Sequence, residues 1–357
     1  MLVDLVPILL PLAGLLAGTA LGYVARRNFF CTLSALERYW YADDASGVRS
    51  WVLAAIVAAA GVWAFSALGW IRPSSSFYLM PQLFPVSAIA GGLAFGIGMA
   101  LVGTCGFGAL VRLGGGSLKS LMAILVLGIT ALSTMRGILG LGRERFFEQW
   151  VLDFSFAGSQ SIPDIASALA GSAAGPLAAA LAIGLPAAWV FSDVKFRTDR
   201  RAIATGIMVG LIILFGWLAT TFLSARSFYP FQIETASFVA PVGDALLQMV
   251  TFTGAAPDYG VGMVFGVVLG AGIAARLGDD IRWEACDDAR ELKRHITGAA
   301  LMGFGGVLAF GCTIGQGISA ASVLAVSVPL TLGSIIIGAR IGLAWLLEGS
   351  IASAFRR

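Results

Sequence analysis

Long apolar runs separated by short polar clusters dominate the chain. The runs cover roughly 5–25, 51–70, 86–104, 118–140, 174–192, 203–223, 259–275, 297–311 and 318–347. Most of these runs are close to the length of about 20 residues that an α-helix needs to cross a bilayer. They are too long for the strands of a membrane barrel. The pattern therefore predicts an all-α polytopic membrane protein with about eight to ten membrane-embedded helices and short re-entrant or loop helices between them.

Composition supports this fold class. The 357 residues are 58% hydrophobic and 12% charged, against roughly 25% charged in a typical soluble domain. The net charge of +3 is small and the basic residues lie beside the apolar runs, which favours a lipid bilayer and not a nucleic acid as the partner. The first apolar run follows Asp4 and is followed by Arg26 and Arg27, so we expect a retained helix and not a signal peptide.

A basic cluster divides the chain near its middle. Residues 193–201 contain Lys195, Arg197, Arg200 and Arg201, the strongest cytoplasmic marker under the positive-inside rule. We predict a first half at 1–192, a basic connecting loop at 193–201 and a second half at 202–357, all within one integral domain of the bacterial inner membrane. If the loop 193–201 lies in the cytoplasm, segment 276–294 is expected to lie in the cytoplasm as well.

A glycine-rich block ending in cysteine occurs in both halves. At a constant offset of 207 (312 minus 105), Gly91, Gly96, Gly98, Leu101, Cys105 and Gly108 match Gly298, Gly303, Gly305, Leu308, Cys312 and Gly315. Such duplication is typical of membrane transporters whose site lies at the repeat interface.

The first predicted helix contains a second, weaker sequence repeat. Gly14 and Gly18 resemble Gly266 and Gly270 at an offset of 252 (266 minus 14). If the halves are inverted, the polar segments that follow these helices, 26–49 and 276–294, are expected on opposite faces.

Cysteine is the reactive residue type that occupies matching positions of both halves. Gly106 and Gly108 follow Cys105, while Gly311 and Gly315 flank Cys312. Glycines of this kind break helices and free backbone amides, and freed amides attract anions. A thiol beside such a turn is suited to a sulfur anion. The alternative is an inert, buried, apolar cysteine, which the repetition disfavours.

Cys31 provides a third thiol, directly after the first helix. Arg26 and Arg27 precede it, and their guanidinium groups would attract a dianion; the alternative is a membrane-flanking anchor with an incidental cysteine. Cys286 lies in an acidic loop and is expected to be a solvated incidental thiol. Three thiols without a nearby histidine or carboxylate lack a fourth zinc ligand, so no metal site is expected.

Three motifs resemble the YeeE/YedE sulfur-transport family over nearly the whole chain. They are Arg27-x-x-Phe30-Cys31, Cys105-x-x-Gly108 and the segment Gly-Cys-Thr-Ile-Gly-Gln-Gly at 311–317. The resemblance implies two inverted pseudo-symmetric repeats. It also implies that Cys31, Cys105 and Cys312 line a narrow path along which thiosulfate passes by successive S–H···S hydrogen bonds.

The chain departs from the family pattern in two places. Family members often have Arg-Gly-Arg-Phe-Cys and Gly-Cys, where this chain has Asn28 and Phe29 before Phe30-Cys31 and Thr104 before Cys105. The first change removes a cation beside Cys31, which the sequence suggests as the thiol where the anion enters. These positions bear on which sulfur anion is preferred.

The sequence thus predicts a thiosulfate transporter, not an enzyme, that needs no cofactor. The predicted substrate-binding residues are Cys31, Cys105, Cys312, Arg27, Gly106, Gly108, Gly311, Gly315 and Gln316. The predicted partners are thiosulfate or a related sulfur anion, the lipid bilayer and a soluble sulfurtransferase. Two alternatives stay open: a SoxT-like sulfur sensor, and a membrane thiol sulfurtransferase that carries persulfide on Cys31 or Cys105. No Gly-x-x-x-x-Gly-Lys-Ser/Thr loop is present, so the chain is not expected to use ATP.

Overall fold

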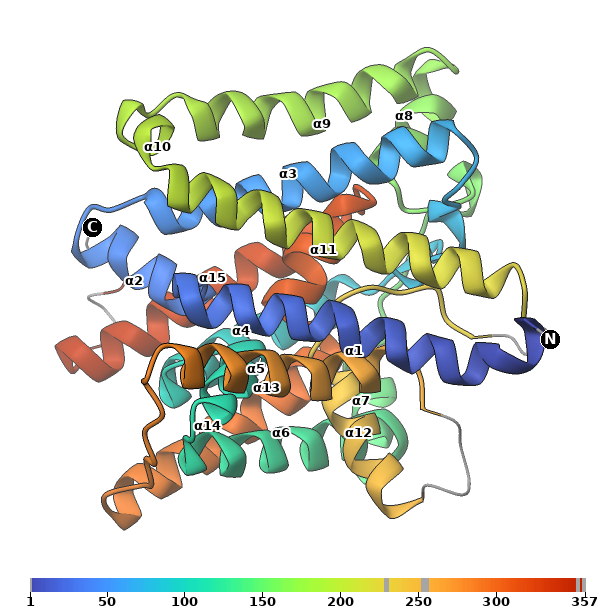
Figure 1. Cartoon of the computed structure of the whole chain (residues 1–357). Helices are drawn as coiled ribbons and strands as arrows, with labels where there is room; N and C mark the ends of the chain where they lie inside the picture. The colour runs from blue at the N-terminus through green and yellow to red at the C-terminus, as the bar shows by residue number, and fades with distance from the viewer. Residues whose placement is uncertain (1, 228–230, 252–256, 351–353, 355–357) are drawn as a thin grey trace.

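A computed structural model describes residues 2–227, 231–251, 257–350 and 354, and its elements are almost all helical (Figure 1). The helices of the N-terminal part are α1 Leu2–Asn28, α2 Thr32–Tyr41, α3 Ser46–Ala67, α4 Pro85–Val102, α5 Gly106–Gly114, α6 Leu118–Arg136, α7 Ile138–Phe146, α8 Ile162–Ala170 and α9 Ala174–Phe191. Those of the C-terminal part are α10 Val194–Thr198, α11 Arg200–Ser224, α12 Ala240–Val250, α13 Tyr259–Leu277, α14 Ala289–Leu308, the π-helical turn η4 Gly315–Ala320 and α15 Ser327–Glu348.

Short elements occupy the loops. They are the 3₁₀ turns η1 Pro73–Ser75, η2 Phe77–Leu79 and η3 Ser155–Ala157, and the strands β1 Gln82–Leu83 and β2 Leu152–Asp153. The strands pair antiparallel, with Gln82 opposite Asp153, and thereby join the loop after α3 to the loop after α7.

Eight segments of the described chain are long and apolar enough to cross a membrane. Two of them are broken helices, α1 with α2 and α4 with α5. The prediction of an all-α polytopic membrane protein is confirmed. The long apolar runs were placed to within a few residues at most ends. The main exception is the last run, which is interrupted between η4 and α15.

The basic segments gather on one face, here called the basic face. Arg26 pairs with Asp280 at 2.8 Å, and Arg201 donates to Asn28 at 3.1 Å. These contacts place 26–49, 193–201 and 276–294 together. The opposite face holds the paired strands and a bridge between Ser76 and Ile233. The expected separation of 26–49 from 276–294 is therefore wrong, although the shared face of 193–201 and 276–294 is as predicted.

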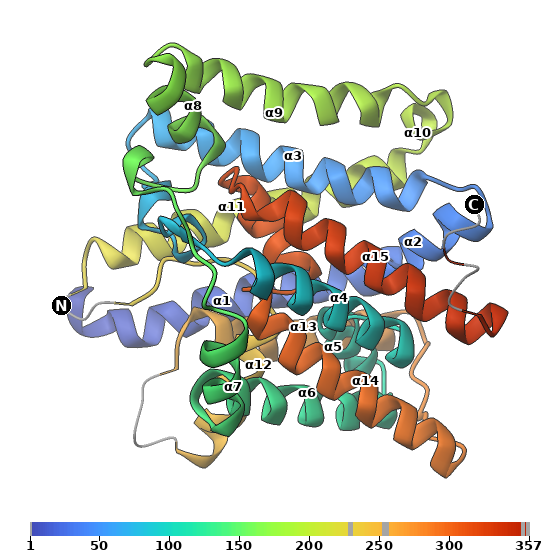
Figure 2. The ribbon, with the colours of Figure 1, turned by 180° about the vertical axis from the view of Figure 1, so that it is seen from behind.

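The repeated glycine blocks form two helices that cross at the centre of the molecule. Within α4 and α14, Gly98 packs on Gly298, and Gly91 packs on Gly305. The repeat equates Gly91 with Gly298 and Gly98 with Gly305, so each contact recurs when the two halves are exchanged. The helices run antiparallel, which is the relation expected of inverted repeats. Figure 2 shows α4 between α14 and α15.

The weaker glycine correspondence is wrong as a repeat. Helices α1 and α13 pack in parallel, with Gly14 on Tyr259 and Gly22 on Val267, whereas inverted copies would run in opposite directions. Helix α11 packs along α3 in the same parallel manner, with Gly206 on Ser50. The counterpart of α1 is thus α11, and the α1 glycines are small residues that permit close helix packing.

Candidate functional site

Each repeated cysteine lies at a break between two helices. Helix α4 ends at Gly103, which has a φ of 76°, and Cys105 is the N-cap of α5. Helix α14 ends in a turn in which Phe310 has a φ of 53° and Gly311 a φ of 150°. Glycine adopts the second value readily because it has no Cβ. Both breaks place a thiol at the crossing of the two halves.

The two thiols make the same local hydrogen bond. The Gly108 amide donates to Cys105 Sγ at 3.4 Å, and the Gly315 amide donates to Cys312 Sγ at 3.4 Å. The amides of Ile314 and Phe238 are also directed at Cys312 Sγ. Amide donation uses a sulfur lone pair and leaves the S–H proton to point elsewhere. Both side chains are fully buried.

Cys31 lies next in this series of thiols. It is the N-cap of α2, and its Sγ lies 4.0 Å from Thr104 Oγ1. A Cβ on Gly108 would lie 3.7 Å from Cys31 Sγ and would clash with Thr104. Glycine at 108 therefore leaves the space between Cys31 and Cys105 unobstructed. The Cys105 thiol lies within electrostatic range of both Cys31 and Cys312.

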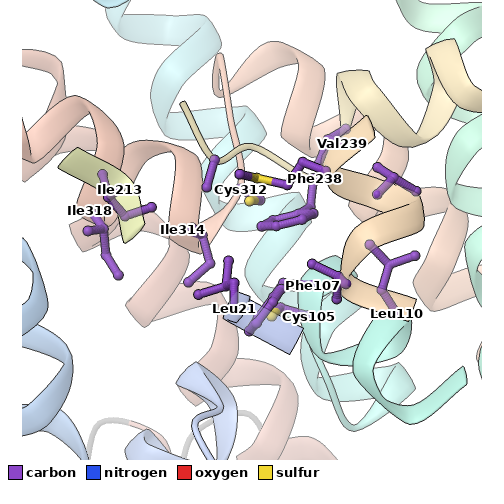
Figure 3. Packing of buried hydrophobic residues seen from close by; sticks show 14 of the residues in the cluster. Leu21, Cys105, Phe107, Leu110, Ile213, Phe238, Val239, Cys312, Ile314 and Ile318 are labelled. Atoms are coloured by element: carbon purple, nitrogen blue, oxygen red, sulfur yellow. The ribbon is translucent and has the colours of Figure 1, made fainter. Parts of the chain in front are cut away.

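Aromatic rings enclose the buried thiols. Figure 3 shows Cys105 and Cys312 within the apolar cluster, with Phe107 and Phe238 beside them. The two ring centroids are 4.9 Å apart. Phe238 stands at the repeat offset of 207 from Cys31 (238 minus 31). The second half thus has a ring where the first half has its third thiol.

A buried hydroxyl accompanies the thiols. Thr313 is fully buried, and its Oγ1 lacks a hydrogen-bond partner among the residues that the structure describes. The Cys105 thiol lies beside it, in reach of a weak hydrogen bond but outside normal hydrogen-bond geometry. A buried hydroxyl without a partner is costly, so Thr313 is placed to bond a polar group that passes between the thiols.

A cavity of about 220 Å³ lies on the side of Cys312 toward the opposite face. We call it the Tyr78 cavity; its lining includes Tyr78, Glu234, Ser237 and Gly311. A Cβ on Gly315 would lie 3.1 Å from Tyr78 Oη and 3.0 Å from Ser237 Oγ. The absent side chain at Gly315 keeps these hydroxyls close to the Cys312 turn.

A second cavity, of about 200 Å³, opens at Cys31 on the basic face. The lining of this Cys31 cavity includes Phe29, Arg38, Asp199 and Arg201 together with Asn28. Beside it lies a basin of about 790 Å³, lined by Arg26, Arg27, Arg112, Lys119, Arg201 and Arg282 together with Asp280 and Glu284. The three thiols thus lie between two cavities that open toward opposite faces.

The other predicted site residues have varied positions. Arg27 lines the basin and not the Cys31 cavity, where Arg38 and Arg201 supply the cations. Gly106 opens α5, and a Cβ there would lie 3.2 Å from the Phe238 carbonyl.

The Gln316 amide is engaged by the protein. It donates to the carbonyls of Ala309 at 3.0 Å and Phe310 at 3.1 Å, and Ser327 Oγ donates to its Oε1 at 3.4 Å. Carbonyls at the end of a helix lack intrahelical partners, so Gln316 fixes the turn that carries Cys312.

Sequence reasoning did not select several residues of this site. Tyr78, Ser237 and Phe238 lie in loops that the fold brings to the glycine block, and no local pattern marks them. Thr313 was visible inside the second cysteine motif. Its unpaired hydroxyl emerges only from burial.

These features define a class of protein: a multi-pass α-helical membrane protein built from two inverted halves, with three thiols between cavities on opposite faces. Inverted repeats of this kind are typical of membrane transporters. The model of the family described as "Sulphur transport" matches residues 27–341. The chain therefore belongs to this family.

Two curated relatives are named "Thiosulfate transporter TsuA". The protein from Escherichia coli (strain K12) is 25% identical over 328 residues, which cover 86% of each chain. The protein from Spirochaeta thermophila is 27% identical over 279 residues, which cover 73% of this chain and 78% of the relative. Their names as transporters fit the prediction that this chain is not an enzyme.

Proposed function

We propose that this protein carries thiosulfate, or a closely related sulfur anion, across the cytoplasmic membrane past Cys312, Cys105 and Cys31. The observation that carries the proposal is the series of three thiols between two cavities on opposite faces. The names of the two relatives support the choice of anion.

Amides and hydroxyls suit the first part of the path. A dianion without partners is too costly to place in an apolar interior. The Tyr78 and Ser237 hydroxyls and the amides around Cys312 offer it donors as water is removed. The Cys312 thiol then donates its proton toward the terminal sulfur of the anion.

The thiols provide successive weak sites. A thiol is a weak donor, so each site holds the anion without trapping it, which conduction requires. Thr313 bonds an oxygen of the anion as it passes Cys105, and Thr104 does so at Cys31. A neutral thiol is needed at each site, because a thiolate would repel the anion.

Passage requires the aromatic rings to move. Cys105 and Cys312 are fully buried, and Phe107 and Phe238 pack against each other beside them. The conformation described here is therefore closed. Phe107 lies in α5 and Phe238 in the loop before α12, so rotation of the two side chains would open space beside the thiols without unfolding α5.

The positive-inside rule orients the molecule. The basic face then lies in the cytoplasm and the Tyr78 cavity faces outward. Cys31 becomes the last thiol before release, in place of the first thiol suggested by the sequence alone. The basin of arginines beside it attracts the released anion. A soluble sulfurtransferase at this face stays a prediction.

The deciding experiment is growth of a strain that lacks its own thiosulfate uptake, with thiosulfate as the only sulfur source. Expression of this chain is expected to restore growth, while cysteine supports both strains. Purified protein in liposomes should also take up labelled thiosulfate. Absence of uptake by folded protein would overturn the proposal.

Removing the Thr313 hydroxyl is expected to slow transport. Thr313→Val keeps the side-chain shape but loses the buried donor, and a hydrogen bond to a charged group contributes about 1.5–3 kcal/mol. Uptake of labelled thiosulfate should fall by roughly tenfold or more.

Thr331→Val is the matched control. Thr331 is also fully buried with an unpartnered hydroxyl within the described residues, but it lies beside Gln316 and Ser327 and lines neither the Tyr78 cavity nor the Cys31 cavity. The Thr331→Val variant should transport thiosulfate at the wild-type rate. Equal uptake by both variants would remove Thr313 from the path.

A further inference from the structure

A carboxyl group lines the same cavity through which the anion is proposed to enter. Glu234 lies in the loop between α11 and α12 and shares the wall of the Tyr78 cavity with Tyr78, Ser237 and Gly311. A carboxylate at this position would oppose a dianion directly. Its protonation state therefore matters for binding.

Among the residues that the structure describes, no lysine or arginine forms a salt bridge with Glu234. The amide of Gly260, in the first turn of α13, donates to its carboxyl group. The charges that act on it most strongly are two further carboxylates, Asp258 at the N-cap of α13 and Asp244 in α12. Arg143 of α7 also lines the cavity.

The nearby arginines are already paired. Arg136 of α6 binds Asp244 at 3.0 Å, and Arg143 of α7 binds Glu148 at 3.3 Å. The remaining titratable neighbours of Glu234 are the hydroxyls of Tyr78 in η2 and Tyr259 in α13.

This environment favours the neutral acid. Burial, followed by the charges of Asp258 and Asp244, raises the pKa of Glu234 to about 8, although the Gly260 amide opposes the shift. A carboxyl group with this pKa is mostly protonated at pH 7 and mostly ionised at pH 9. Glu234 therefore changes charge within a range that cells and assays reach.

Proton binding and anion binding at this cavity must be linked. A protonated Glu234 removes the repulsion felt by an incoming dianion, and a bound dianion in turn makes ionisation of Glu234 harder. Such coupling is reciprocal by thermodynamic necessity. It needs only that the two ligands occupy the same cavity.

We propose that Glu234 is the proton-binding residue of the Tyr78 cavity and that the cavity takes up the sulfur anion together with a proton. This inference rests on the proposed function. It assigns proton-coupled uptake of the anion to a loop residue that lies outside the apolar runs.

The pH profile of uptake tests the inference. Wild-type uptake into cells or liposomes is expected to fall about tenfold as the external pH rises from 7 to 9, as the protonated fraction of a group with a pKa near 8 does. Glu234→Gln, which stays neutral, should transport equally at both values. Asp153→Asn, an exposed carboxyl change in β2 at the same face, should keep the wild-type profile.

Two outcomes overturn the inference alone: uptake by the wild type that does not change with pH, and a Glu234→Gln profile that falls like the wild type. Failure of the wild type to transport thiosulfate at any pH overturns the proposed function, and the inference falls with it. Measuring uptake at pH 6.5 in every series keeps the two failures distinguishable.

A second measurement applies if Glu234→Gln fails to fold. Calorimetry of thiosulfate binding to the purified wild type at pH 8.5, in two buffers of different ionisation enthalpy, reports protons taken up on binding. We expect net uptake of a substantial fraction of a proton for each anion bound. Binding without proton uptake would overturn the inference.

Discussion

Replacing Cys312 or Cys105 by alanine is expected to reduce thiosulfate uptake to near background. Each thiol is fully buried at a break between helices and accepts a hydrogen bond from the amide three residues later in the chain. Its loss leaves a desolvated anion without a donor midway between the cavities. An unmade buried hydrogen bond costs about 1–3 kcal/mol, more for charged groups, so a loss of roughly one hundredfold is expected at a single station.

Cys286→Ala is the control for this experiment. Cys286 lies in the loop between α13 and α14 on the basic face, and burial together with the charge of Glu291 raises the pKa of its thiol. Cys286 lines neither the Tyr78 cavity nor the Cys31 cavity. The Cys286→Ala variant should therefore transport normally. If Cys105→Ala and Cys312→Ala also transport normally, the thiol relay is wrong even though the family assignment stands.

Gly338→Ala is expected to destabilise the fold. Gly338 lies in α15 against the backbone of Leu93 in α4, and an added Cβ would overlap the Leu93 carbonyl oxygen. Neither helix can give way easily, because both belong to the central packing of the two halves. Overpacking of this kind costs about 1–3 kcal/mol. The melting temperature in detergent, measured as the loss of the size-exclusion peak after heating, should fall clearly.

The same helix supplies the control. Gly333 has open space around the position of an added Cβ, so Gly333→Ala removes a glycine from α15 without a new contact. Alanine favours helix over glycine by about 1 kcal/mol in water, and the variant should be at least as stable as the wild type. A Gly338→Ala protein as stable as Gly333→Ala would contradict the close packing of α4 and α15.

The long helices could be predicted from the sequence because the bilayer demands about 20 apolar residues for each crossing. The short helices could not. Helix α2 follows Cys31 within a segment rich in polar residues, and α5 has nine residues. Their positions depend on contacts with α3, α6 and α13, which no local pattern encodes.

The correspondence between the two buried thiols was predictable because it rests on repetition. Cys105 and Cys312 were found because the same block occurs twice, and the structure gives them the same amide bond. Arg27 was selected for its nearness to Cys31 in sequence, yet a side chain at the end of a helix can point away from its neighbour. Arg201 reaches the Cys31 cavity from α11, 170 residues further along the chain (201 minus 31).

Helix α9 determines the relative orientation of the two halves, because it adds one membrane crossing between them. From α1 to α6 the chain crosses four times and so ends on the face where it began. A second copy starting there would insert in the same direction as the first. Helix α9 is one additional crossing, and it delivers α11 to the basic face, which reverses the second copy. Only 17% of its apolar window is buried, and it lies at the edge of the molecule (Figure 1). Its length, far more than its side chains, is what makes two tandem halves antiparallel.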